Sequence, residues 1–129
     1  MSLNVERAIR SVFTLHDQIE AVFSQADVDA TLAELLACFS SNFEMITIKG
    51  QRIQYPQLQA LFTNNMGAWP DFKIEISEVM VITEAADHVL LRYQEQQVKQ
   101  GVVTLRQSTA LIEFQGEHCL WRYLHETTV

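Results

Sequence analysis

A histidine interrupts an apolar helical stripe near the start of the chain. His16 occupies one position of a stripe whose other members are Val5, Ile9, Val12, Ile19 and Phe23. Spacings of three and four residues are typical of one face of an amphipathic helix. A buried histidine needs partners for both ring nitrogens. Two interpretations therefore remain open for His16: a core residue bonded to the backbone or a tyrosine, or a pocket residue that titrates near neutral pH.

The last predicted strand, His118–Thr127, carries a second group of chemically useful side chains. Regular alternation would place on one face Cys119, Trp121, Tyr123, His125 and Thr127. Aromatic bulk mixed with hydrogen-bonding groups is typical of small-molecule pockets. Plain core packing with polar tips at the rim explains the same pattern. Tyr93 shares a face with two apolar residues of its own strand and could join this pocket.

Arg106 lies in the middle of a predicted strand, between Leu105 and Ser108. An inward arginine could hold a carboxylate or phosphate through two parallel hydrogen bonds. An outward arginine would instead pair with Glu95 or Glu113. Both faces of this strand carry apolar residues, so alternation alone leaves the two orientations open.

Other chemistry finds little support. The four histidines are scattered without metal-ligand spacing, and we expect no metal. The four glycines form no phosphate-binding loop, and we expect no cofactor. Ser108 has no relay partner in the sequence, although such triads are assembled in space. Glu44 and Asp17 have the residue type of acid or base groups but fit exposed positions.

The composition limits the possible partners. The 129 residues carry a formal net charge of −7, which opposes non-specific binding to nucleic acid and to anionic membranes. The first ten residues show no apolar segment of a signal peptide. Cys38 and Cys119 form no CxxC motif and fit two free thiols. We expect a cytoplasmic protein with one domain over residues 1–129.

Patterns along the chain divide it into helices and strands. We predict helices over residues 5–23, from Asp27 or Asp29 to residue 39, and from Tyr55-Pro56 to about Gly67. Residues 43–48 (FEMITI) and a short return near Arg52 predict a strand pair. Four long strands follow at Phe72–Ala85, His88–Val98, Val102–Phe114 and His118–Thr127. Their short connections indicate an antiparallel meander.

The sheet predicted by this pattern has too few polar positions for one wet face. Val79, Met80, Val81 and Ile82 are apolar at consecutive positions, whereas a half-exposed antiparallel strand should alternate. Helices would cover one face of such a sheet. We expect a second copy of the chain to cover the other, giving a homodimer.

Several segments resemble the nuclear transport factor 2-like superfamily, in its SnoaL-like and ketosteroid isomerase-like branch. Residues 23–29 (FSQADVD) resemble its first interhelical turn, and residues 35–43 (LLACFSSNF) resemble its entry into the first strand. Arg106-Gln107-Ser108 with residues 121–127 (WRYLHET) resembles the close of its SnoaL-like proteins. The resemblance implies an α+β, cystatin-like cone: three N-terminal helices packed in a curved antiparallel sheet, with a βαβ-type insertion after the second helix.

The same resemblance opposes one activity. Ketosteroid isomerases use a tyrosine in the first helix and an aspartate in the first strand pair. Aligning the turns at Asp27 and Gly50 brings Ile19 and Thr47 to those positions, and neither side chain can perform that chemistry.

The leading hypothesis is a domain that binds a small molecule in an internal pocket. The residues expected to line it are His16, Tyr93, Arg106, Trp121, Tyr123 and His125. One alternative is a cofactor-independent enzyme that moves a proton on a hydrophobic molecule, with His16 or His125 as the catalytic candidate. Another is a non-catalytic oligomerisation module.

Overall fold

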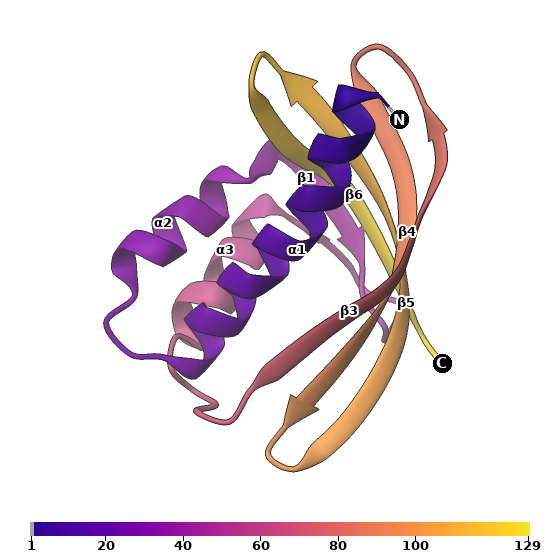
Figure 1. The fold of residues 1–129 in the computed structure, drawn as a ribbon. Coiled ribbons are helices and arrows are strands. Elements are labelled where there is room, and N and C mark those ends of the chain that lie inside the picture. Colours follow the sequence, from indigo (N-terminus) through magenta and orange to yellow (C-terminus); the bar gives the residue numbers. More distant parts are fainter. Residues whose placement is uncertain (1) are drawn as a thin grey trace.

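The fold is described by a computed structural model that covers residues 2–129. Its elements follow in the order α1 (Leu3–Ser24), α2 (Asp29–Ala37), β1 (Phe39–Ile46), β2 (Arg52–Gln54), α3 (Tyr55–Asn64), β3 (Lys73–Glu84), β4 (His88–Lys99), β5 (Val102–Gln115) and β6 (His118–Thr128). The three helices lie in the hollow of one curved sheet (Figure 1). This is the α+β cone predicted from the sequence, and the four long strands begin and end within one residue of their predicted bounds.

Helix α1 forms because its apolar stripe has a partner surface and its first turn is capped. The Ser2 hydroxyl accepts a hydrogen bond from the Val5 amide and so satisfies one of the free N–H groups of the first turn. Val5, Val12, His16 and Phe23 of the predicted stripe are buried. The histidine is therefore an interior residue, as the spacing indicated.

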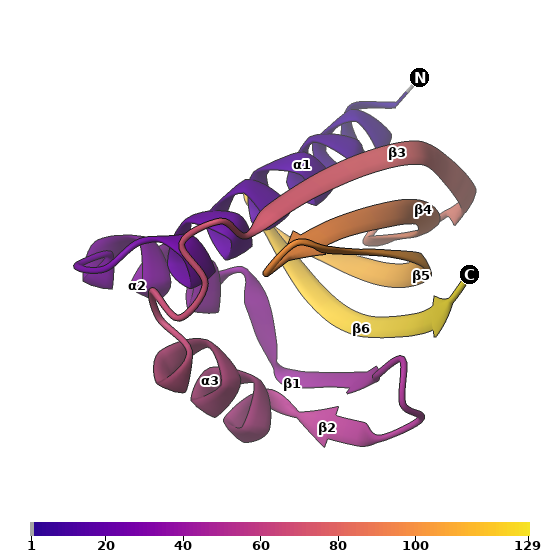
Figure 2. The same cartoon turned by 90° about the horizontal axis from the view of Figure 1, so that it is seen from below.

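The sheet has the strand order β2-β1-β6-β5-β4-β3. All neighbouring pairs are antiparallel except β1 and β6, which run parallel. The predicted purely antiparallel sheet is corrected to a mixed one at this pair. Seen from below, β1 and β2 curl away from the other strands and lie beside α3 (Figure 2). The hollow thus has a floor of β3–β6 and a side wall of β1 and α3.

Both boundaries of the second helix differ from the expectation. The second helix ends at Ala37, and Phe39 together with residues 40–42 belongs to β1. Its N-cap is Val28, without a side-chain hydrogen bond, and not Asp27 or Asp29. Phe39 fits either pattern locally, but its pairing with Trp121 across β1 and β6 places it in the sheet. A contact between residues far apart in the sequence decides this boundary.

Helix α3 ends at Asn64, before Gly67 and Pro70. The connection that follows folds back onto the end of α1, where the Gly67 amide donates to the Val22 carbonyl and the Trp69 amide to the Phe23 carbonyl. The last carbonyls of α1 therefore gain partners. This docking also holds Trp69 beside the end of the hollow.

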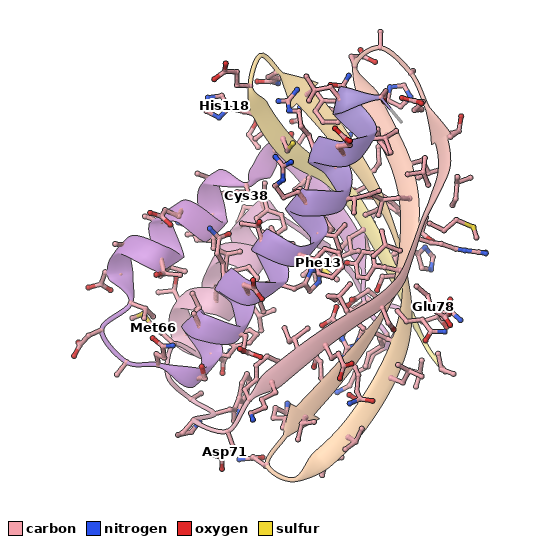
Figure 3. The ribbon with its side chains drawn as sticks, in the orientation of Figure 1. Phe13, Cys38, Met66, Asp71, Glu78 and His118 are labelled. Carbon is pink, nitrogen blue, oxygen red and sulfur yellow. The ribbon has the colours of Figure 1, made fainter. Side chains whose placement is uncertain are left out.

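Side chains fill most of the space between the helices and the inner face of the sheet (Figure 3). Within residues 2–129, no helix is long and apolar enough to cross a membrane. The cytoplasmic location expected from the sequence stays a prediction.

Candidate functional site

A cavity of about 250 Å³ lies between the helices and the inner face of the sheet. Six aromatic side chains border it: Phe23, Phe39, Phe43, Phe62, Trp69 and Phe72. Its other apolar neighbours come mainly from α1, β1 and α3. The charged and polar neighbours are His16, Glu95, Gln97, Lys99, Arg106 and Glu126. The cavity therefore has aromatic walls and a polar floor on strands β4, β5 and β6.

His16 reaches this floor from α1. Its Nδ1 lies 2.7 Å from the Val12 carbonyl oxygen. Because a carbonyl only accepts, Nδ1 carries a proton and donates it. Nε2 faces the sheet and lies 3.0 Å from Oε1 of Glu95 and 3.3 Å from the Tyr93 hydroxyl. His16 thus bonds the backbone and a tyrosine, as the first interpretation has it, and it also borders the cavity. Its titration near neutral pH stays a prediction.

His16 and Glu95 form a buried ion pair. Burial disfavours the charged form of both groups, but their mutual hydrogen bond and opposite charges outweigh it. The pKa of His16 is therefore raised and the pKa of Glu95 is lowered. The contact between the two side chains therefore stabilises the charged form of each, the imidazolium and the carboxylate.

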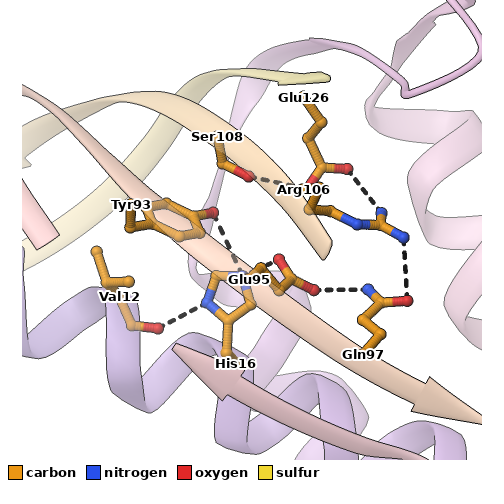
Figure 4. Close-up of polar contacts among 8 residues, drawn as sticks. All are labelled: Val12, His16, Tyr93, Glu95, Gln97, Arg106, Ser108 and Glu126. Atoms are coloured by element: carbon orange, nitrogen blue, oxygen red, sulfur yellow. Dashed lines mark hydrogen bonds and ion pairs between the residues drawn. The ribbon is translucent and has the colours of Figure 1, made fainter. Parts of the chain in front are cut away.

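Hydrogen bonds continue from Glu95 across the floor (Figure 4). Gln97 Nε2 donates to Glu95 Oε2 at 2.6 Å, and Arg106 Nη2 donates to Gln97 Oε1 at 3.1 Å. Arg106 Nη1 lies 3.2 Å from Glu126 Oε1, and the Ser108 hydroxyl donates to Glu126 Oε2 at 3.3 Å. We call His16, Glu95, Gln97, Arg106, Ser108 and Glu126 the polar network. It links three strands and one helix in a single chain of contacts.

Glu126 and Glu95 belong to the same network, but their pKa values are shifted in opposite directions. Burial and the nearby charge of Glu95 raise its pKa, and the Arg106 ion pair only partly opposes them. One carboxyl group thus favours the ionised form and the other is shifted toward the protonated form. Pairs of carboxyl groups with opposite shifts are typical of sites that transfer protons.

Strand register brings the network together. Tyr93, Glu95 and Gln97 occupy alternate positions of β4, so their side chains share its inner face. Glu95 lies opposite Arg106, and Tyr93 lies opposite Ser108. Arg106 is therefore inward, and it pairs with Glu126 in place of the outward partners Glu95 or Glu113 that were considered.

The alternation predicted for the last strand fails at Arg122. Ile112 pairs with Trp121 and Leu111 pairs with Tyr123, so β6 contains one extra residue there. Such a β-bulge reverses the faces of all following residues. Trp121 is inward, but Tyr123 and His125 face outward and do not border the cavity. Their side chains contact each other outside it, at 3.4 Å between the hydroxyl and Nδ1.

Tyr93 and Trp121 are fully buried and pack edge-on against His16, with ring centroids 5.1 and 5.9 Å away. The Trp121 indole N–H donates to the Ser11 hydroxyl at 2.8 Å. Neither residue borders the cavity directly. They support the imidazole from behind and so fix its orientation toward Glu95.

Sequence reasoning missed Glu95, Gln97 and Glu126. The first two could have been found, because they follow Tyr93 at intervals of two on the same strand. Glu126 could not have been found, because simple alternation places it on the other face of the strand from Trp121. Among residues 2–129, no three His, Cys, Asp or Glu side chains are grouped as metal ligands.

Comparisons with known proteins place this geometry in a wider group. No protein-family model matches the chain, and no curated protein matches it. A solved structure of an NTF2-like protein of unknown function from Pseudomonas aeruginosa is 27% identical, with a TM-score of 0.91 over 95% of this chain and 98% of that one. The chain therefore has the fold of the nuclear transport factor 2-like superfamily. Its SnoaL-like branch stays a prediction.

Other solved structures share the fold at lower identity. A protein provisionally named a scytalone dehydratase, from Novosphingobium aromaticivorans, is 9% identical with a TM-score of 0.81, over 97% of this chain and 83% of that one. The association domain of C. elegans CaMKII is 12% identical with a TM-score of 0.76, over 96% and 95%. At such identities the likeness concerns the fold and not the function.

Proposed function

We propose that this protein binds a small, mainly apolar molecule in the cavity, with the polar end of the molecule against the polar network. The observation that carries the proposal is the combination of six aromatic side chains with a few convergent polar groups around one internal space. Binding sites for small molecules have this composition. A plain core would instead close the space with apolar contacts.

The volume limits the size of the ligand. Pockets for drug-sized molecules hold roughly 300–1,000 Å³, whereas this cavity holds about 250 Å³. A fused pair of six-membered rings is therefore a suitable size class. The aromatic walls favour a flat molecule, because rings pack edge-on or offset against one another.

The neutral probe 2-naphthol tests this proposal by isothermal titration calorimetry. We expect Met45→Trp to weaken its binding at least about tenfold, because Met45 borders the cavity and an indole would fill it. Ile48→Trp adds the same ring at an exposed turn that does not border the cavity. This control should bind within about twofold of the unaltered protein.

Circular dichroism shows whether both variants are folded. Equal binding by a folded Met45→Trp variant and the unaltered protein would place the ligand elsewhere. If neither 2-naphthol nor compounds with the same rings and a different polar group bind the unaltered protein, the proposal itself is contradicted.

A second function, cofactor-independent proton transfer, is favoured by one observation. Glu95 and Glu126 are shifted in opposite directions within one network, which provides a base and an acid at the same cavity. His16 is the catalytic candidate that borders the cavity, whereas His125 lies outside it. The dehydratase name of one structural neighbour is compatible with such chemistry. Exchange of a bound ketone's acidic C–H with solvent deuterium would distinguish catalysis from binding alone.

We further propose a homodimer through the outer face of the sheet. Leu90, Leu111 and Tyr123 lie side by side on that face in three neighbouring strands. Met80 and Ile82 of β3 are about half exposed, at 52% and 51%. Two structural neighbours carry the name of kinase association domains, which supports an oligomeric role for the chain. Binding in the cavity and dimerisation on the other side of the sheet are compatible.

A further inference from the structure

The cavity differs in charge from the molecule that contains it. The whole chain carries a formal net charge of −7. The charged side chains around the cavity are His16, Glu95, Lys99, Arg106 and Glu126. Because His16 Nε2 lies 3.0 Å from a Glu95 oxygen, one proton lies between them and the pair is neutral as a whole. The other two cations, Lys99 and Arg106, outnumber the remaining carboxylate, Glu126, by one. The excess grows if Glu126 takes up a proton, as its raised pKa favours.

Lys99 provides the cation that lacks a carboxylate. His16 is paired with Glu95, and Arg106 with Glu126. None of the ion pairs found among residues 2–129 includes Lys99. Its ammonium group instead lies 4.4 Å from the centre of the Trp69 ring. Lys99 is exposed and Trp69 half-buried, so a cation and an indole stand together at the edge of the cavity.

Near Gln97 and Arg106 the polar network has more hydrogen-bond donors than acceptors. An ionised Glu95 accepts at both oxygens, from His16 and Gln97, and the Gln97 oxygen accepts from Arg106. Each guanidinium Nη and the Gln97 Nε2 carries two hydrogens, of which the network uses one. The spare N–H groups belong to two residues that border the cavity. A ligand atom that meets them must be an acceptor.

Strand geometry connects these features. Glu95, Gln97 and Lys99 occupy alternate positions of β4. Each lies roughly 7 Å along the strand from the next. They form a row on one face that runs from the buried carboxylate to the exposed ammonium. Arg106 joins the row at Gln97 through its 3.1 Å hydrogen bond. An anionic group between Gln97 and Lys99 would meet donors from two strands.

From this arrangement we infer that the cavity selects a small aromatic monoanion, with its carboxylate between Lys99 and the Gln97–Arg106 donors and its rings among the aromatic walls. The inference rests on the proposed small-molecule function and specifies the ligand class. A neutral ligand leaves the spare donors and the Lys99 charge without a partner. A cationic ligand adds to an existing positive excess in a poorly solvated space.

Three probes of the same shape test the inference by calorimetry at pH 7.5: 2-naphthoate, 2-naphthamide and 2-naphthylmethylammonium. They carry a negative, a neutral and a positive group on one ring system. We expect the carboxylate to bind about tenfold more tightly than the amide, since charge-assisted hydrogen bonds are the stronger ones. The ammonium compound should bind most weakly.

Lys99→Gln should reduce the preference of the carboxylate over the amide to within about twofold. Lys49→Gln removes the same charge from an exposed turn that does not border the cavity, and it should leave the preference unchanged. Lys99→Arg keeps the charge and should restore most of the preference. Because Lys99 is exposed, these substitutions leave the core intact, and circular dichroism verifies this.

Two outcomes overturn the inference alone. One is that the protein binds 2-naphthol but shows no preference for 2-naphthoate over 2-naphthamide. The other is a preference that Lys99→Gln and Lys49→Gln lower equally. If 2-naphthol and all three charged or neutral probes fail to bind, the proposed function falls together with the inference.

Discussion

At the scale of single residues, His16 connects a helix to the sheet that faces it. Its Nδ1 is fixed by the Val12 carbonyl of its own helix, and its Nε2 is directed to Glu95 of β4. Both ring nitrogens are therefore engaged, which a buried histidine requires. Removing either partner of a buried ion pair leaves an uncompensated charge. The pair thus ties the protonation of the site to the stability of the fold.

The pKa shifts of His16 and Glu95 determine how the stability of the fold depends on pH. The pKa of His16 is raised above 6.5, so its contribution to stability is fully present below pH 6.5 and is lost as the pH rises through the folded-state value. The pKa of Glu95 is lowered below 4.5, so its contribution is present above pH 4.5 and is lost as the pH falls through the folded-state value. The pair stabilises the fold most between these limits.

We therefore expect the free energy of unfolding to fall as the pH rises above 6.5. Each unit by which the pKa is raised corresponds to about 1.4 kcal/mol. Glu95→Gln should remove this fall, because the charge that holds the proton on His16 is gone. Urea unfolding at a series of pH values measures the effect.

Asp87→Asn is the matched control for this prediction. Asp87 and His88 form an exposed carboxylate–histidine contact at 2.8 Å, and exposed pairs contribute little. The variant should keep the fall in stability above pH 6.5. A flat profile in the unaltered protein would contradict the buried ion pair.

At the scale of elements, the bulge in β6 decides which side chains reach the cavity. The extra residue at Arg122 lets Trp121 and Leu124 both face inward, although three positions separate them. It also brings Glu126 to the polar network and leaves Tyr123 and His125 outside. One irregular residue thus sets the chemistry of the last strand.

Deleting Arg122 should remove the bulge and leave the two faces of the strand unchanged. Tyr123 would then be the single outward residue between Trp121 and Leu124, so Leu124 and Glu126 would stay inside. We expect the free energy of unfolding to fall by about 1 kcal/mol, because the deletion removes the hydrogen bond from Arg122 to the Asn42 carbonyl. Urea unfolding followed by circular dichroism measures this loss.

Arg122→Ala keeps the number of residues and therefore the bulge. It removes the hydrogen bond from Arg122 to the Asn42 carbonyl, at a cost of about 1 kcal/mol. A loss of about 3 kcal/mol or more in the deletion, but not in the substitution, would contradict this expectation, because it would show that Leu124 or Glu126 had left the interior.

At the scale of the whole molecule, the two faces of the sheet differ in composition. Its inner face carries the polar network and the cavity. Its outer face carries leucines in register on β4 and β5, next to Tyr123 of β6. A broad apolar patch on a protein surface marks an interaction site more often than it is left in water. The proposed dimer would bury this face and leave the cavity free.

Sedimentation equilibrium at micromolar concentration should therefore give the mass of a dimer. Leu111→Glu should shift the protein to a monomer, because it places a charge in the centre of the outer face. Leu3→Glu introduces the same charge at a 68% exposed position on α1, away from that face, and should leave the dimer intact. A monomeric unaltered protein would contradict the covered-face proposal.

The sequence by itself determined the architecture and part of the site. Helix periodicity placed His16 inside, and the strand bounds followed from local alternation and turn residues. These signals are local, because a few neighbouring residues suffice to express a period. The same alternation placed Tyr93 on one face of its strand with Val89 and Leu91.

The tertiary structure alone decided the rest. Phe39 joins the sheet because it pairs with Trp121, more than eighty positions away. Glu126 enters the cavity and His125 leaves it because β6 gains a residue against β5. The direction of Arg106 depends on Glu126, and the positive excess in the cavity depends on all of these contacts. Register and ion pairing join distant segments, so no local pattern in the sequence contains them.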